Sequence, residues 1–289
     1  MNFTWNHSSD SWRIEQTWTM EKDTPLTSSE QSELDVYMQS RITHSDDVYQ
    51  YNRSSIEPSA QLRERLKIPL HKKVAILFTN VLWDAASSDR DILFSSPIDW
   101  VTKTIELAQN YSSDLHLVIR IHPAELVIGT QQRFQDVLSK LVPMIPSNVT
   151  VLTPDVDINS WTLYDLGDVG LVHTTTAGLE MVMKGKPVIV VSETHYRDKG
   201  FTIDPSNIQE YRAIFENLDS LNLSSQSQAL ALKYAYLVLL KYQYQFPFID
   251  MDKNKQITLN HKSIHEVLQH SQFKHLIDCI GNQTPIMNP

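Results

Sequence analysis

The 289-residue chain lacks several features that would assign it to a familiar class of protein. Its single cysteine, Cys279, excludes an internal disulfide. No apolar run reaches the roughly 18 residues of a membrane-spanning helix. The first residues, MNFTWNHSSDSW, lack the basic start and the apolar stretch of a signal peptide. We therefore expect a cytoplasmic protein, with a peripheral location at the inner face of the membrane as the alternative.

Basic charge is also scarce. The chain has 25 basic and 34 acidic residues, a net charge of -9, whereas a groove that neutralises nucleic-acid phosphates needs the opposite balance. The glycine patterns GxGxxG, GxxxxGK[ST] and GxSxG are all missing. We therefore expect no nucleic-acid partner, and the dinucleotide-dependent oxidoreductase, kinase and serine hydrolase classes lack support.

Only seven glycines occur, and their placement is informative. None precedes Gly129, and five lie between positions 167 and 200: Gly167, Gly170, Gly178, Gly185 and Gly200. Glycine gathers where the backbone bends sharply or where a ligand approaches it closely. The sequence therefore predicts a site in this window.

Five short apolar runs, rich in β-forming residues, alternate with amphipathic segments. The runs span 74–80, 115–121, 148–152, 169–172 and 187–191, and the helical segments between them include 97–110, 131–142, 160–166 and 174–185. Parallel strands need such crossovers, so the pattern predicts an α/β fold with a doubly wound parallel sheet. The hydrophobic content of 41% is enough for a sizeable core.

The flanking segments differ from this pattern. Residues 1–70 are polar and predict short helices and loops, with one helix over 24–41 behind a Ser/Thr cap. The remainder after 191 is predicted to be mostly helical, including 225–244, whose aromatic residues we expect in a core, and 262–277. The expected domains are an N-terminal segment, 1–70, and a sheet domain with a helical tail, 71–289.

Polar residues follow the predicted strands, where ligands bind in an open parallel sheet. After the fourth strand come His173 and the hydroxyls of Thr174–Thr176, followed by a helix whose first amides can seat a phosphate. Gly178 would let a ligand approach, and Glu180 could accept both hydroxyls of a ribose. The alternative is ordinary helix capping, by Thr174 or Thr175, with Glu180 as a favourable first-turn acid.

Two other strand ends carry hydrogen-bond donors. His122 precedes Pro123 after the second strand, and Arg120 lies two residues earlier on the same pleat face, so both can face a phosphate. Tyr196 and Lys199 follow the last strand in a polar loop. A structural histidine is the alternative for His122, and a solvated loop is the alternative for the last group.

Three segments together resemble the capsule polysaccharide biosynthesis family, which is related to bacterial Kdo transferases and to GT-B sialyltransferases. They are NVLWDAA, RIHPAE and DVGLVHTTTAGLEMVMKGKPVIVVSETHYRDKGFTID. The resemblance covers residues 73–205 strongly and the flanks loosely. It implies a Rossmann-like sheet, the C-terminal half of a GT-B fold, with helical N- and C-terminal extensions.

The resemblance also implies a reaction. A sugar would pass from a CMP-, UDP- or GDP-linked donor to a glycan or lipid-linked acceptor, and the nucleotide sugar is a substrate rather than a cofactor. His122 falls on the family's phosphate-contacting histidine, Thr174–Thr176 on its phosphate turn and Glu180 on its ribose-side carboxylate. Tyr196 and Gly200 fall on the loop after the last strand.

One departure from the family leaves alternatives open. GT-B enzymes carry an N-terminal acceptor-binding domain, and the polar segment before the first strand is too short for one. A partner chain could supply that domain, or the chain could be a non-catalytic module of a polysaccharide synthesis or export complex. A sugar-nucleotide 2-epimerase is the other enzyme class to consider.

The chemistry beyond donor binding has weaker signals. Asp84 is the best local candidate for a catalytic base, because Trp83 beside it can desolvate the carboxylate and raise its pKa; a structural aspartate is the alternative. Asp155 and Asp157 spell the DxD pattern of metal-dependent glycosyltransferases, but Asp157 or Asn159 as a helix N-cap explains them better. The strand-end histidines lack the local spacing of a zinc site, so we expect no bound metal.

Overall fold

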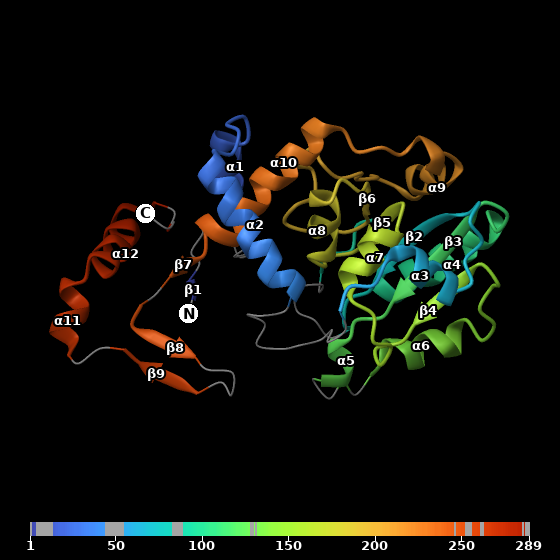
Figure 1. Ribbon diagram of the computed structural model, residues 1–289, viewed down its shortest axis with the longest axis horizontal. Helices are drawn as coiled ribbons and strands as arrows, with labels where there is room; N and C mark the ends of the chain where they lie inside the picture. The colour runs from blue at the N-terminus through green and yellow to red at the C-terminus, as the bar shows by residue number, and fades with distance from the viewer. Residues whose placement is uncertain are drawn as a thin grey trace. The chain divides into compact units, whose positions relative to one another are not determined.

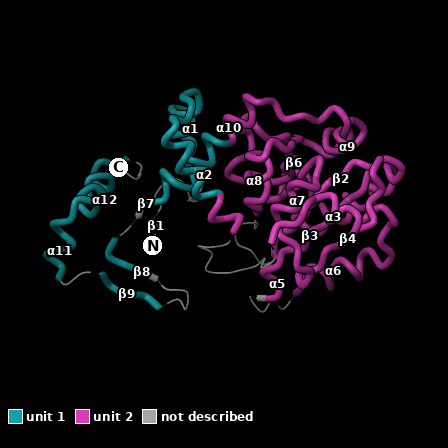
Figure 2. Tube along the Cα trace, viewed as in Figure 1, with its two compact units in different colours: residues 1–38, 232–289 teal, residues 39–231 magenta. Residues whose placement is uncertain are grey.

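The computed structural model describes residues 2–3, 14–43, 55–82, 89–127, 130, 132–245, 247–251, 256–260, 263–284 and 286. The chain divides into two compact units, which Figure 2 colours separately: unit 1 comprises residues 1–38 and 232–289, and unit 2 comprises residues 39–231. Helices α2 (Ser28–Thr43) and α10 (Ser225–Tyr236) each contain the boundary between the units. The domain boundary expected at residue 70 stays a prediction.

Unit 2 contains a five-stranded parallel sheet. Its strands are β2 (Lys73–Phe78), β3 (Leu115–Arg120), β4 (Val149–Leu152), β5 (Val169–Val172) and β6 (Val188–Val190). Their order is β4-β3-β2-β5-β6, so the chain adds strands outward from β2 on one side and then resumes with β5 on the other (Figure 1). The predicted α/β fold with a doubly wound parallel sheet is confirmed.

Helices cover both faces of this sheet. Helices α4 (Pro97–Asn110), α6 (Phe134–Leu141) and α9 (Ile208–Glu216) share one core with alternate strand residues such as Ala75 and Leu77. On the opposite face, Tyr164 of α7 (Ser160–Leu166) meets Phe78 edge-on at 5.5 Å, and α8 (Ala177–Met183) lies along β5 and β6. The shorter elements are α3 (Ser59–Arg65), α5 (Ala124–Val127) and the 3-10 turn η1 (Leu218–Ser220).

Local capping fixes where several helices begin. Thr27 and Glu30 form a reciprocal capping box at α2, which confirms the predicted Ser/Thr cap. Ser96 Oγ accepts from Asp99 N at 3.2 Å at the start of α4. Asn159 Oδ1 accepts from Trp161 N at 2.9 Å and caps α7, so of the two predicted caps the asparagine is the one used.

Unit 1 joins sequence-remote segments. Trp18 of α1 (Glu15–Glu21) meets Tyr234 edge-on at 5.2 Å, and Glu21 Oε2 lies 3.2 Å from Nζ of the buried Lys233. Helix α10 continues as a π-helix, η2 (Leu237–Lys241), and its aromatic residues are buried as expected. The other helices are α11 (Ile264–Gln269) and α12 (Ser271–Asn282).

The tail differs from the prediction in two ways. Two short antiparallel strand pairs occur, β1 (Asn2–Phe3) with β7 (Tyr244–Gln245) and β8 (Ile249–Met251) with β9 (Ile257–Leu259). The predicted helix 262–277 is broken at His270, which has an extended backbone and caps α12 by accepting from Gln272 N at 3.3 Å. Across the described residues, no helix combines the length and the apolar character needed to span a membrane.

Candidate functional site

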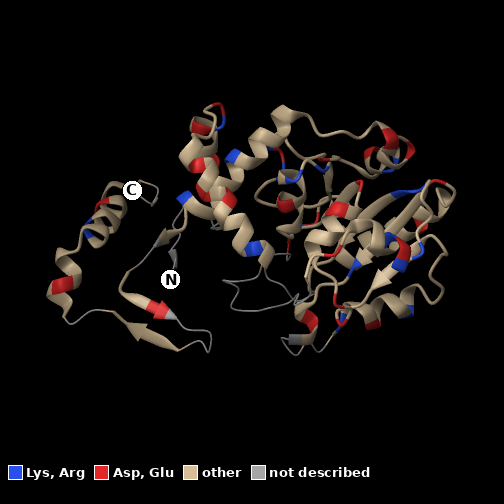
Figure 3. Cartoon of the chain, viewed as in Figure 1, with Lys and Arg blue, Asp and Glu red and all other residues tan. Residues whose placement is uncertain are grey.

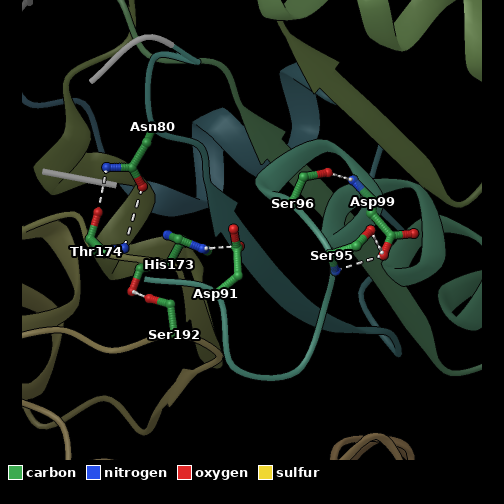
Figure 4. A network of polar contacts seen from close by, with 8 residues as sticks. All are labelled: Asn80, Asp91, Ser95, Ser96, Asp99, His173, Thr174 and Ser192. Atoms are coloured by element: carbon green, nitrogen blue, oxygen red, sulfur yellow. Dashed lines mark hydrogen bonds and ion pairs between the residues drawn. The ribbon is translucent and has the colours of Figure 1, made fainter. Parts of the chain in front are cut away.

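The strand order reverses between β2 and β5, and open parallel sheets bind ligands outside the carboxyl ends of the strands at such a switch point. We call this end of the sheet the crevice. The chain leaves β2 toward α4 on one face of the sheet and leaves β5 toward α8 on the other. Asn80 bridges the diverging loops: its Nδ2 donates to Thr174 Oγ1 at 2.9 Å, and its Oδ1 accepts from Thr174 N at 3.4 Å (Figure 4). The amide therefore fixes the start of the turn that follows β5.

A second bridge joins the same two loops. His173 Nε2 lies 2.9 Å from Asp91 Oδ1, and Ser192 Oγ donates to the carbonyl oxygen of His173 at 2.6 Å (Figure 4). Burial lowers the pKa of His173, although the hydrogen bond to Asp91 and its charge act in the opposite direction. At neutral pH the ring is therefore uncharged, and the contact with Asp91 requires its proton on Nε2.

The threonine turn lies between β5 and α8. Thr176 is exposed, has helical dihedral angles and makes no side-chain cap bond, so the capping bond at the start of α8 comes from Thr175, one of the two residues named in the capping alternative. Thr175 Oγ1 accepts from Ala177 N at 3.4 Å, and the Thr175 carbonyl accepts from Tyr196 Oη at 2.5 Å. The tyrosine thus holds the turn from the loop after β6.

Gly178 is close to the same tyrosine. A Cβ atom at position 178 would lie 2.5 Å from Tyr196 Oη and 2.9 Å from Val172 Cγ2, so only glycine fits without a shift. Burial raises the pKa of Tyr196 far above its usual range, which keeps its hydroxyl a donor. The space beside Gly178 is filled by protein, and a ligand approach there stays a prediction.

The loop after β6 is largely buried, not solvated. His195 and Arg197 are each 8% exposed, and the Arg197 guanidinium donates to the carbonyls of Val190 and Pro205 at 2.6 and 2.7 Å. This arginine therefore ties the loop together. Lys199 is half-buried in the same loop, and its contact with a ligand stays a prediction.

Glu180 lies one turn into α8 and has protein donors on both oxygens. Tyr164 Oη donates to Oε2 at 2.6 Å, and Arg41 Nη2 lies 3.3 Å from Oε1. Burial and the neighbouring Glu180 raise the pKa of Tyr164, so the tyrosine remains protonated. These contacts orient the carboxylate, and its expected contact with a ribose stays a prediction.

The β3 side of the crevice carries the histidine-proline pair. His122 N donates to Thr79 Oγ1 at 3.1 Å, and His122 Nδ1 accepts from Ala124 N at 3.1 Å. An Nδ1 that accepts must leave the ring proton on Nε2. The local backbone therefore selects a tautomer of His122 with a donor at Nε2.

Arg120 and Glu125, which flank His122, are buried. Arg120 Nη1 donates to the Thr153 carbonyl at 2.8 Å; burial lowers its pKa to about 10, against the opposing charges of Asp157 and Asp155, so it stays charged at neutral pH. Both Glu125 oxygens accept from Phe134 N, at 2.9 and 3.1 Å. A direct contact of Arg120 with phosphate stays a prediction.

The structure brings many of the predicted residues together and adds others. His173 and Thr174 lie at the switch point, Tyr196 contacts Thr175, and His122 lies at the end of the neighbouring strand β3. Asp84 and Trp83 lie outside the described residues. Sequence reasoning did not single out the polar partners that hold these residues in place: Asn80, Asp91, Ser192, Arg41 and Tyr164.

Charge near the crevice is mixed. Figure 3 shows acidic and basic residues interspersed over the helices and loops of unit 2. Asp155 and Asp157, the DxD pair, are exposed after β4. Within the described part of the chain, no three His, Cys, Asp or Glu side chains are grouped as a metal site would require.

Comparison with protein families gives one match. The family model described as "Capsule polysaccharide biosynthesis protein" matches residues 29–244, which include the sheet and every described residue of the crevice. No curated protein sequence matches the chain.

Several solved structures resemble the chain. KpsC of Thermosulfurimonas dismutans, a beta Kdo 2,4 transferase, matches at 16% identity and a TM-score of 0.46 over 72% of this chain and 56% of that one. The wall teichoic acid polymerase TagF (H444N variant) matches at 14% identity and a TM-score of 0.40, over 62% of this chain and 42% of that one. The UDP-GlcNAc 2-epimerase of Neisseria meningitidis matches at 18% identity and a TM-score of 0.40, over 71% of this chain and 51% of that one.

The chain thus spans about half the length of these solved structures. At identities and TM-scores this low, we draw no functional conclusion from the likenesses.

Proposed function

Because the chain belongs to the capsule polysaccharide biosynthesis family, we propose that it binds a nucleotide sugar and forms the donor-binding part of a glycosyltransferase that builds a surface polysaccharide. The observation that carries the proposal is the bridged switch point, where Asn80 holds the Thr174 turn between β2 and β5. In doubly wound sheets, nucleotides bind at this position. The donor would be linked to CMP, UDP or GDP.

In this proposal, uncharged donors hold the phosphates. His122 would donate from Nε2, because its Nδ1 is already an acceptor. The three threonines would donate from their hydroxyls, and Thr175 and Thr176 also from their backbone amides, since the Thr174 amide already donates to Asn80. Donors fixed before the reaction stabilise the charge that develops on the leaving nucleotide without rearranging. Arg120, held by the Thr153 carbonyl, adds positive charge at the end of β3.

The proposed acceptor is a glycan or a lipid-linked glycan. Transfer needs a base that takes the proton of the acceptor hydroxyl, and Asp84 remains our candidate for it. A domain that binds the acceptor would come from a partner chain or from further sequence. We place the reaction in the cytoplasm, where nucleotide sugars are available.

Ligand-dependent thermal unfolding tests the binding step. CMP, UDP and GDP are each added to the wild type, to His122→Ala and to Thr175→Ala. A nucleotide at 100 times its Kd should stabilise the wild type by about 2.7 kcal/mol, and both variants should lose most of this gain. His71→Ala is the matched control, because His71 is exposed before β2, at the opposite end of the sheet.

Two outcomes would count against the proposal. Absence of stabilisation by all three nucleotides would remove the donor site, and equal stabilisation of wild type and both variants would move it elsewhere. Release of free nucleotide from the matching nucleotide sugar, with and without added glycan acceptor, then separates an enzyme from a binding module.

A further inference from the structure

Asp91 has a carboxylate whose two oxygens differ. Oδ1 lies 2.9 Å from His173 Nε2, whereas Oδ2 has no hydrogen-bond partner in the part of the chain that the structure describes. The Asp91 side chain is 29% exposed and that of His173 is 2% exposed. One oxygen is therefore anchored inside the protein, and the other is available at the carboxyl ends of the strands.

The backbone around Asp91 is anchored as well. Asp91 forms an isolated antiparallel bridge with Ser192, just after β6, and Glu193 N donates to the Arg90 carbonyl at 2.8 Å. The position of the carboxylate is thus set by the ends of β5 and β6, and not by its own loop alone. Groups held in this way from several elements can orient a ligand.

Among the described residues, the side chain of His173 makes one hydrogen bond, to the Asp91 carboxylate. Its ring lies 6.1 Å from that of Trp100, and its Nδ1 is buried without a hydrogen-bond partner among the described residues. An unsatisfied buried nitrogen carries a desolvation penalty that an apolar side chain at this position would avoid. The imidazole is therefore best explained by the bond that its Nε2 donates to Asp91.

The charge of the pair selects a ligand group. Because burial keeps His173 uncharged, nothing within the pair neutralises the Asp91 carboxylate. A carboxylate repels phosphate and accepts hydrogen bonds from hydroxyls. Across the switch point, Asn80 and Thr174 present uncharged amide and hydroxyl groups. The crevice thus has one side suited to phosphate and another suited to a polyol.

We propose that Asp91 is a sugar-binding residue, whose Oδ2 accepts a hydrogen bond from a hydroxyl of the transferred sugar while His173 acts as the positioning residue for the carboxylate. This inference rests on the proposed function and names the part of the donor that Asp91 recognises. It predicts that Asp91 distinguishes a nucleotide sugar from the free nucleotide.

The test compares Asp91→Asn with Asp99→Asn. An asparagine at 91 still offers Oδ1 to His173 but replaces the charged acceptor with an amide. Asp99, eight residues further along, is the matched control, because the described partners of its side chain all lie at the start of its own helix. Its Oδ2 accepts from Ser95 N at 3.0 Å, from Ser95 Oγ at 2.8 Å and from Lys103 Nζ at 3.2 Å. Figure 4 shows the contacts of both aspartates with their serine and histidine partners.

Calorimetry would measure Kd for three pairs of probes: CMP and CMP-N-acetylneuraminate, UDP and UDP-N-acetylglucosamine, GDP and GDP-mannose. For the nucleotide that binds, we expect Asp91→Asn to raise the Kd of the nucleotide sugar about 10-fold and the Kd of the free nucleotide less than about twofold. Asp99→Asn should change neither Kd. Unfolding without ligand, recorded for each variant, separates loss of fold from loss of contact.

The positioning role has its own readout. His173→Gln keeps a donor that can reach Asp91, whereas His173→Leu does not. We expect the leucine variant to lose the preference for nucleotide sugar over nucleotide and the glutamine variant to retain part of it.

The outcomes separate the two proposals. If the wild type binds no nucleotide, the proposed function fails and the inference with it. If nucleotides bind but the ratio of the two Kd values is the same in wild type and Asp91→Asn, the inference is overturned and the proposed function stands. An equal loss for both ligands also overturns it, because Asp91 would then act on the nucleotide or on the fold.

Discussion

The two sides of the crevice are held together in different ways. On the β3 side two functional groups are held locally: His122 Nδ1 accepts from Ala124 N, two residues later, and Glu125 accepts from Phe134 N, nine residues later, although the backbone of His122 is also bound to Thr79, 43 residues away. On the β5 side the contacts join remote segments, as in Asn80 with Thr174, 94 residues apart. The orientation of the His122 ring therefore depends on its own segment, whereas the turn after β5 depends on a strand far away in the sequence.

The largest effect should come from breaking the β5 side at Gly178. A Cβ there would collide with Tyr196 Oη at 2.5 Å and Val172 Cγ2 at 2.9 Å, and relieving the collision must move the tyrosine off the turn. We expect Gly178→Ala to lower the free energy of unfolding by about 1–3 kcal/mol, measured by chemical denaturation.

Gly281→Ala is the control for this substitution. A Cβ atom at position 281 would have no other side chain of the described ranges within 4 Å. Because Gly281 lies in α12, an alanine there should leave the free energy of unfolding unchanged or raise it by about 0.5–1 kcal/mol. Unchanged stability of Gly178→Ala would show that Tyr196 can shift freely and that the β5 side is less dependent on remote contacts than described.

A smaller effect should come from the β3 side. Glu125→Ala leaves the buried Phe134 N–H without its acceptor, which should cost about 1–2 kcal/mol. Glu125→Gln keeps an acceptor oxygen and should lose less. The site on the β5 side should stay intact in both, so nucleotide affinity at Thr174 provides the comparison.

The shifted pKa of Glu125 determines how the stability difference between Glu125→Gln and the wild type changes with pH. Burial raises the pKa of Glu125, so its contribution to stability falls as pH rises through the ordinary carboxyl range toward the higher folded value. Because glutamine does not ionise, the stability deficit of Glu125→Gln relative to the wild type should be smallest at neutral pH. A larger deficit at pH 7 than at pH 4 would contradict this.

The smallest effect should be the acid sensitivity of His173. Its folded pKa is below the ordinary value, so stability is lost as pH falls from the ordinary histidine range through the folded pKa. Because Asp91 opposes the lowering, the net effect is modest, and Asp91→Asn should make the loss steeper. Unfolding midpoints at pH 7 and pH 5 would check this, and an unchanged slope would mean that Asp91 does not act on His173.

The sequence predicts the sheet well because each buried parallel strand is an apolar run bounded by polar residues, as in 115–121 and 169–172. It does not predict β1, β7, β8 or β9, because strands of two or three residues are too short to carry an alternating pattern. The break at His270 was missed because the helical spacing continues on both sides of it.

The same limit applies to the site. The turn after β5 and the histidine after β3 follow from the rule that ligands bind at strand ends. The residues that hold these groups in place do not follow from that rule. Arg41 and Glu180, for example, are 139 residues apart, and no sequence motif links them. Asn80 ends the first predicted run and Asp91 follows it, and once the order β3-β2-β5 is known, Asn80 can be placed opposite the turn after β5.

The pairing of sequence-remote segments in unit 1 has a consequence for folding during synthesis. Thr17 bonds to Tyr242, 225 residues later, and Trp18 and Glu21 also find their partners in α10. At about 5–20 residues per second, the N-terminal segment must wait roughly 10–45 seconds on the ribosome for those partners. The sheet of unit 2 emerges in between, so it can complete its hydrogen bonds while the first helix is still exposed to chaperones.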